Sequence, residues 1–186
     1  MRLPLLACLA IATLSACAEP ARVTGMTVSR QAELVPKTSP LANAICVKRV
    51  TGGEKTDPLW TSEVDSPSFE QALNLSLANN NLKGTSTCAF DLNANLLGLA
   101  QPTAGFNMTV TSNVNYSLLE RQSQAPYFQT TVKTPFTAEF GTAFAGVERL
   151  RLANEGSIRA NISQFLGELI EHQKTTTPPE PAVPSS

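Results

Sequence analysis

The sequence is poor in the side chains that most catalytic and metal sites need. Its 186 residues include a single histidine, His172, and four cysteines, two of which lie within the first 17 residues. A nucleophile needs a base within reach, and a metal site needs three or four converging ligands. One histidine near the end of the chain and two distant cysteines supply neither. The sequence therefore predicts a non-enzymatic protein with no catalytic residue, no metal and no cofactor.

Excess positive charge is also missing, since 14 Lys and Arg face 15 Asp and Glu. This balance argues against a nucleic-acid partner and against polybasic binding to a membrane. The segment from Gly141 to Gly146 lies where a phosphate-binding loop would lie, but Val147 and Glu148 replace the Lys and hydroxyl pair that such a loop requires. The hexapeptide repeats of β-helix acyltransferases are absent as well.

The apolar stretch that follows Met1 and Arg2 is too short for a transmembrane helix, which needs about 20 apolar residues. Its layout is that of a signal peptide. It ends in Leu14-Ser15-Ala16-Cys17, which resembles the lipobox of bacterial lipoproteins. The resemblance implies removal of residues 1–16 and acylation of Cys17, with palmitate among the acyl chains. The alternative is an ordinary secretory signal that is cut near Ala16 or Ala18.

A lipid on Cys17 would anchor the mature chain stably without a helix, because each buried methylene contributes ~0.8 kcal/mol. Ala18, and not Asp, follows the cysteine. By resemblance to enteric sorting rules, this favours the periplasmic face of the outer membrane of a Gram-negative bacterium. The lipobox thus implies a cell-envelope protein whose first partner is the membrane.

Composition divides the mature chain into three parts. Residues 17–40 are polar and punctuated by proline, which predicts a tether between the lipid and the folded body. Residues 41–173 form one α+β domain. Residues 174–186 are rich in proline and threonine and predict a disordered tail.

Hydrophobic periodicity predicts the order β-α-β-β-β-α within the domain. Residues 42–50 predict a strand, residues 66–79 a helix that begins at Ser66-Pro67, and residues 146–171 a long helix. Three segments between the helices alternate apolar and polar residues, with apolar residues at even positions. These residues are Cys88, Phe90, Leu92, Ala94 and Leu96, then Phe106, Met108, Val110, Val114 and Tyr116, then Phe128, Val132, Phe136, Ala138 and Phe140. We expect a four-stranded mixed sheet with both helices packed on its apolar face and the first two strands parallel.

Cys46 and Cys88 remain after the signal peptide is removed. An even pair in an oxidising compartment favours a disulfide. Against it, Cys88 falls on the apolar positions of its strand, whereas Cys46 alternates against its apolar neighbours Ile45 and Val47. Two free thiols are therefore the alternative.

Two regions are candidate partner contacts. Trp60 lies in the long acidic loop 52–66 and either covers the first helix or contacts a partner. Asn107, Thr109 and Thr111 lie on the polar face of the sheet, which has no helix left to cover it. That face is either simply solvated or a docking surface, and an exposed edge strand is a further possible contact.

The segments Asp57-Pro58-Leu59-Trp60-Thr61-Ser62 and 147–155, together with the lipobox, resemble a family of small uncharacterised proteobacterial outer-membrane lipoproteins. Some members of that family carry the name UDP-N-acetylglucosamine acyltransferase. The inferred element order is also similar to the LPS-assembly (LptE-type) lipoprotein and to auxiliary lipoproteins of lipid-transport systems. These resemblances imply an assembly or accessory subunit with an envelope protein as partner. The alternatives are a periplasmic carrier of lipids or other apolar ligands, and an enzyme on envelope sugars or lipids.

Overall fold

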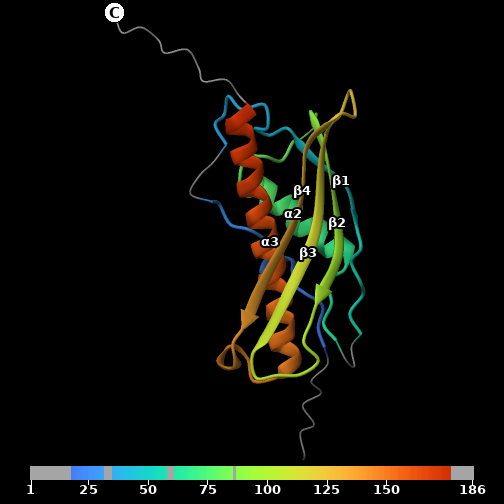
Figure 1. Cartoon of the computed structure of the whole chain (residues 1–186), viewed down its shortest axis with the longest axis vertical. Coiled ribbons are helices and arrows are strands. Elements are labelled where there is room, and N and C mark those ends of the chain that lie inside the picture. The colour runs from blue at the N-terminus through green and yellow to red at the C-terminus, as the bar shows by residue number, and fades with distance from the viewer. Residues whose placement is uncertain (1–17, 32–34, 58–60, 86, 177–186) are drawn as a thin grey trace, which may run out of the picture.

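The computed structural model describes residues 18–31, 35–57, 61–85 and 87–176. The elements, in chain order, are α1 (Val23–Met26), β1 (Ile45–Thr51), α2 (Ser66–Asn79), β2 (Phe90–Ala100), β3 (Met108–Glu120), β4 (Pro126–Ala138), the 3-10 helix η1 (Phe140–Thr142) and α3 (Gly146–Thr176). The strands form one sheet in the order β1-β2-β3-β4. β1 and β2 are parallel and the other neighbours antiparallel, which confirms the predicted mixed sheet. Figure 1 shows both long helices behind this sheet, which confirms the predicted α+β architecture.

The alternation of apolar and polar residues places one face of each strand in the core. In β3, every even-numbered residue from Met108 to Leu118 is buried, including Ser112. The core joins this face to α2 and α3, and its members include Phe69, Leu73, Leu77, Leu92, Val114, Tyr116, Ile158, Ile162 and Phe165.

The sheet is shorter at one end than the pattern predicts. β3 begins at Met108, which pairs with Ala138 at the end of β4. Phe106 and Phe140 continue the alternation in sequence but lie beyond this last pair, and they are 78% and 57% exposed. Asn107 likewise lies in the loop before β3, so it does not belong to the polar face of the sheet.

Local signals set the ends of the helices. The Asp65 side chain accepts a hydrogen bond from Ser68 N (2.7 Å) and caps α2, one residue earlier than the predicted cap at Ser66. Pro67 lies in the first turn, where its missing N–H costs no hydrogen bond. α3 continues to Thr176, so its last turn takes in residues 174–176 of the predicted tail.

The segment predicted as a tether belongs to the folded body in its described part. Ala21, Met26, Val28 and Val35 are buried in the main core, and Met26 is fully buried within the short helix α1. The backbone is bonded to the domain as well, since Ala21 N donates to Glu63 O (3.1 Å). The apolar residues of this segment are too widely spaced to show a period, which is why the pattern did not reveal their burial.

Candidate functional site

The outer face of the sheet carries exposed polar side chains and no helix of the described chain, as the front of Figure 1 shows. Cross-strand hydrogen bonds tie these side chains together. Thr109 Oγ1 and Thr137 Oγ1 lie 2.8 Å apart, and Asn115 Nδ2 donates to Thr131 Oγ1 (2.9 Å). Such pairs stabilise the sheet and hold the hydroxyl and amide groups in fixed positions. The outer face of β3 and β4 is therefore a polar surface whose side chains are tied together across the strands.

The structure separates the predicted partner contacts. Thr109 and Thr111 both lie on the outer face of β3, with Thr109 exposed and Thr111 half-buried. Asn107 instead turns into the neighbouring loop, where its Oδ1 accepts a hydrogen bond from Phe140 N (3.0 Å). Trp60 and Cys17 lie outside the described residues.

Cys46 and Cys88 are joined by a disulfide, with their Cα atoms 5.7 Å apart. The sequence pattern had opposed this bond by placing both residues in strands with side chains on opposite faces. Cys88 lies two residues before β2 begins at Phe90, so strand alternation does not fix its direction. The bond closes the loop that runs from β1 through α2 to the start of β2.

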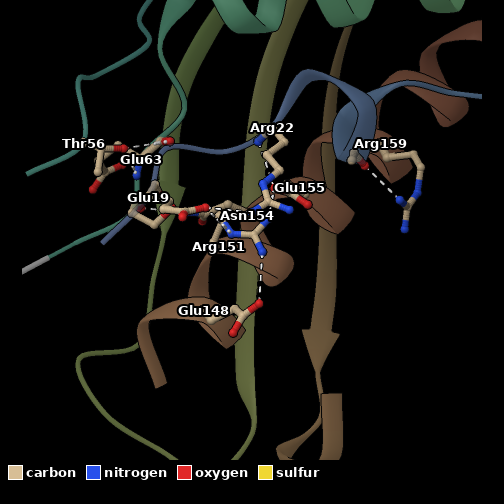
Figure 2. A network of polar contacts seen from close by, with 11 residues as sticks. Glu19, Arg22, Thr56, Glu63, Glu148, Arg151, Asn154, Glu155 and Arg159 are labelled. Carbon is tan, nitrogen blue, oxygen red and sulfur yellow. Dashed lines mark hydrogen bonds and ion pairs between the residues drawn. The ribbon is translucent and has the colours of Figure 1, made fainter. Parts of the chain in front are cut away.

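A buried ionic network joins the N-terminal segment to α3 (Figure 2). Arg151 and Glu155 form an ion pair with Nη1 2.5 Å from Oε1, and the same oxygen accepts from the backbone N–H of Arg22 (2.8 Å). Glu19 and Glu148 approach the same guanidinium to 4.0 and 3.4 Å. The alternating charges of α3 predict a solvated face, but residues 18–26 cover it and leave Arg151 and Glu155 only 4% and 5% exposed.

Two buried asparagines of α3 hold loops and strands in place, as their spacing on an apolar helical face predicts. Asn154 Nδ2 donates to Ser62 O (2.7 Å), and Gln101 Nε2 donates to Asn154 Oδ1 (3.1 Å). Asn161 accepts from the Tyr116 hydroxyl (2.9 Å) and donates to the backbone of β4. Burying polar groups is tolerated when each finds a partner, so these contacts are structural.

Burial shifts the pKa values of two side chains near this network, Glu63 and Tyr116. Burial, and then the charge of Glu54, raises the pKa of the Glu63 carboxyl, which lies beside Gln101. Burial raises the pKa of the Tyr116 hydroxyl well above its ordinary value.

His172 lies against Tyr127 and Phe128 at the end of α3, with ring centroids 5.5 and 5.0 Å away. Within the described ranges, no three His, Cys, Asp or Glu residues converge as a metal site would require.

Comparison with known structures finds this fold in two bacterial proteins of solved structure. A Caulobacter crescentus CB15 protein described as a candidate lipoprotein is 13% identical, with a TM-score of 0.51 over 75% of this chain and 96% of that chain. The chain shares its fold with bacterial lipoproteins. Protein XCC0632 of Xanthomonas campestris, of the DUF330 family, is 11% identical, with a TM-score of 0.54 over 81% of this chain and 96% of that chain.

A minor lipoprotein of Acinetobacter baumannii is less similar, with 11% identity and a TM-score of 0.42 over 68% of this chain and 94% of that chain. No protein-family model matches the sequence, and no curated protein matches it. At these identities the likeness shows a common fold and no more. In the part of the chain that the structure describes, no helix is both long and apolar enough to cross a bilayer.

Proposed function

We propose that this chain is a lipid-anchored accessory subunit of a Gram-negative envelope complex, held by Cys17 at the periplasmic face of the outer membrane. The observation that carries the proposal is the uncovered polar face of β3 and β4. Non-obligate protein interfaces are about as polar as the rest of the surface, so such a face is suited to docking. The lipobox and the shared lipoprotein fold support the anchor. The narrower similarity to the LPS-assembly (LptE-type) lipoprotein stays a prediction.

The face, and not the edge of the sheet, is the proposed contact. β4 is one edge strand, and it carries Lys133 and Pro135. Charge and proline on an edge strand discourage the addition of another strand. On the outer face, cross-strand hydrogen bonds hold Thr109 and Thr137 in position before a partner arrives. Groups that are already ordered lose little entropy on binding.

An apolar-ligand carrier would need space between the sheet and α3. Tyr116 stacks on Phe165 there, with ring centroids 4.1 Å apart, and both side chains are fully buried. The Tyr116 hydroxyl also donates to Asn161. At this position protein side chains fill the space that a ligand would occupy, so docking through the outer face is the better-supported function.

Site-specific photocrosslinking in whole cells tests the docking surface. A photoreactive residue at Thr111 or Thr137 is expected to crosslink to the same envelope protein, because both positions lie on the outer face. The matched control is Gln71, an exposed residue of α2 on the other side of the molecule. Recovery of only the free monomer from Thr111 and Thr137, or equal crosslinking from Gln71, would contradict the proposal.

The anchor is tested separately with Cys17→Ala. This variant is expected to leave the membrane fraction and lose its crosslinks, while its circular dichroism spectrum stays that of the parent. The mass of the parent should also show the added acyl chains. Full function of Cys17→Ala would mean that the lipid only directs the protein to the envelope and is not needed for its function there.

A further inference from the structure

Three phenylalanine side chains are exposed together at one end of the molecule. Phe106 in the β2–β3 loop, Phe140 in η1 and Phe144 just before α3 are 78%, 57% and 101% exposed. The rings of Phe106 and Phe140 are in edge contact, with centroids 5.5 Å apart. Exposed aromatic clusters of this kind mark protein contacts or membrane contacts. We call these three residues the phenylalanine cluster.

The loops that carry the cluster contain no basic residue, and their one charged residue is the exposed Glu139 directly after β4. Residues 101–107 and 140–147 consist of Gly, Ala, Thr, Pro, Gln, Asn, Val and Phe. Moving a charge out of water is costly, and small neutral residues avoid that penalty. The loops therefore match the boundary between lipid headgroups and acyl chains, where an apolar ring can be buried beside polar backbone groups.

The exposed position of Phe144 is held by a buried arginine. Arg149 is only 6% exposed, and its Nη1 donates to the carbonyl oxygens of Ala143 (2.7 Å) and Phe144 (3.0 Å). Its guanidinium also lies over the Phe140 ring, 5.0 Å from the centroid. These contacts fix the loop with the Phe144 ring outward. They also satisfy two carbonyl groups that would otherwise lose their water on entering lipid.

The cluster lies at the end of the molecule where the lipid anchor would attach. Ala18 directly follows Cys17, and consecutive Cα atoms are about 3.8 Å apart. Glu19 Oε2 lies 4.0 Å from Nε of Arg151, which is two residues after Arg149 in the first turns of α3. Figure 1 shows the described chain starting at the same end as the two loops, opposite the β3–β4 hairpin.

We propose that the phenylalanine cluster inserts into the surface of the bilayer that holds the anchor. The molecule then stands on the membrane, with Phe106, Phe140 and Phe144 in the headgroup region and the β3–β4 hairpin directed away from it. The occupant of this surface is zwitterionic phospholipid, because the loops offer no basic side chain to anionic lipid. This inference rests on the lipid anchor of the proposed function.

Fluorescence of the full-length lipidated protein in phosphatidylcholine vesicles tests the insertion. Trp60→Phe removes the sole native tryptophan, and Phe144→Trp places a new one in the cluster. The matched control is Gln122→Trp in the exposed β3–β4 turn at the opposite end. We expect Phe144→Trp emission to shift to shorter wavelength on vesicles and to lose most of its intensity when the lipid is brominated. Gln122→Trp emission should change in neither respect.

Emission that is unchanged for Phe144→Trp, or quenched equally for both variants, would overturn the insertion. If the tryptophan of Phe144→Trp is protected from water only in native envelopes and remains exposed to water on pure lipid vesicles, the cluster is a protein contact and the inference is wrong. Flotation with the vesicles and the mass of the acylated chain report the anchor independently. A protein that floats with unquenched Phe144→Trp therefore refutes the insertion alone, whereas a chain without lipid refutes the anchor itself.

Discussion

Asp91 shows how one residue can be buried on the solvent-facing side of a sheet. The alternation of β2 places it on the polar face, yet it is only 3% exposed because Arg121 and Lys48 cover it. Arg121 Nε donates to its Oδ1 (2.8 Å), and Lys48 Nζ lies 3.6 Å from its Oδ2. Burial opposes ionisation of Asp91, but the hydrogen bonds and charges of Arg121 and Lys48 outweigh burial and lower the pKa of the carboxyl.

Asp91→Asn is expected to lower the free energy of unfolding by about 1 to 2 kcal/mol at neutral pH, because it removes charge-assisted hydrogen bonds. A lowered pKa stabilises the fold above the ordinary aspartate pKa of 3.8, and this contribution is lost as the pH falls through the folded value. Urea unfolding from pH 7 to pH 3 should show the two proteins converging at low pH. A constant difference across that range would refute the ionic contribution.

The role of a single residue could be predicted from the sequence only where it depends on neighbours in the same helix or strand. Asn154 and Asn161 were predicted as buried hydrogen-bonding groups because both lie on an apolar stripe of one helix. The alternating charges of α3 predict that Arg151 and Glu155 are solvated, because helical spacing shows only which face is apolar. It does not show that a distant segment, residues 18–26, covers the polar face.

At the scale of elements, α3 and β4 approach each other closely at Gly156. A Cβ added at this position would overlap the ring of Phe136. Gly167 lies on the same helix, is exposed, and has nothing within 4 Å of such a Cβ. Substituting each glycine by alanine therefore distinguishes two effects within α3. At Gly156 the added Cβ disturbs packing, and at Gly167 it changes only the helix propensity of the backbone.

Gly156→Ala is expected to destabilise the protein by about 1 to 2 kcal/mol, since displacing the Phe136 ring outweighs the gain in helix propensity. Gly167→Ala should instead stabilise it by about 0.5 to 1 kcal/mol through that same propensity. Thermal and urea unfolding of both variants measure the difference. Equal shifts of the same sign would show that α3 does not pack tightly against Phe136.

The strands were predictable in direction and face, but not at their ends. Period-two alternation fixes the inward residues because a shift of one residue would move the whole apolar set to the solvent-facing side. The same alternation continues to Phe106 and Phe140, where the strands no longer pair. Pairing depends on a neighbouring strand, so no local pattern marks where it stops. The exposure of Phe106 and Phe140 was missed for this reason.

At the scale of the whole molecule, the Cys46–Cys88 disulfide closes a long loop that contains α2, and its two cysteines are 42 positions apart in the sequence. In the chain-entropy model, closing such a loop stabilises the fold by about 4 kcal/mol. Replacing both cysteines by serine is expected to remove most of that stability, as measured by urea unfolding of parent and variant. Reductant should destabilise the parent and leave the double variant unchanged. Alkylation of both thiols in the unreduced parent would disprove the bond.

The described structure has no flexible linker between its first residue, Ala18, and the folded domain. Ala18 is 6% exposed, and Glu19 and Arg22 are bonded to the domain. A flexible linker of n residues would let the body range over roughly 5–6 Å × √n from its lipid. Without such a linker, the anchored protein would diffuse with its lipid in the plane of the membrane. It would extend from the membrane surface by no more than its own length. At the proposed position on the outer membrane, the chain would therefore leave the other members of its complex to span the periplasm.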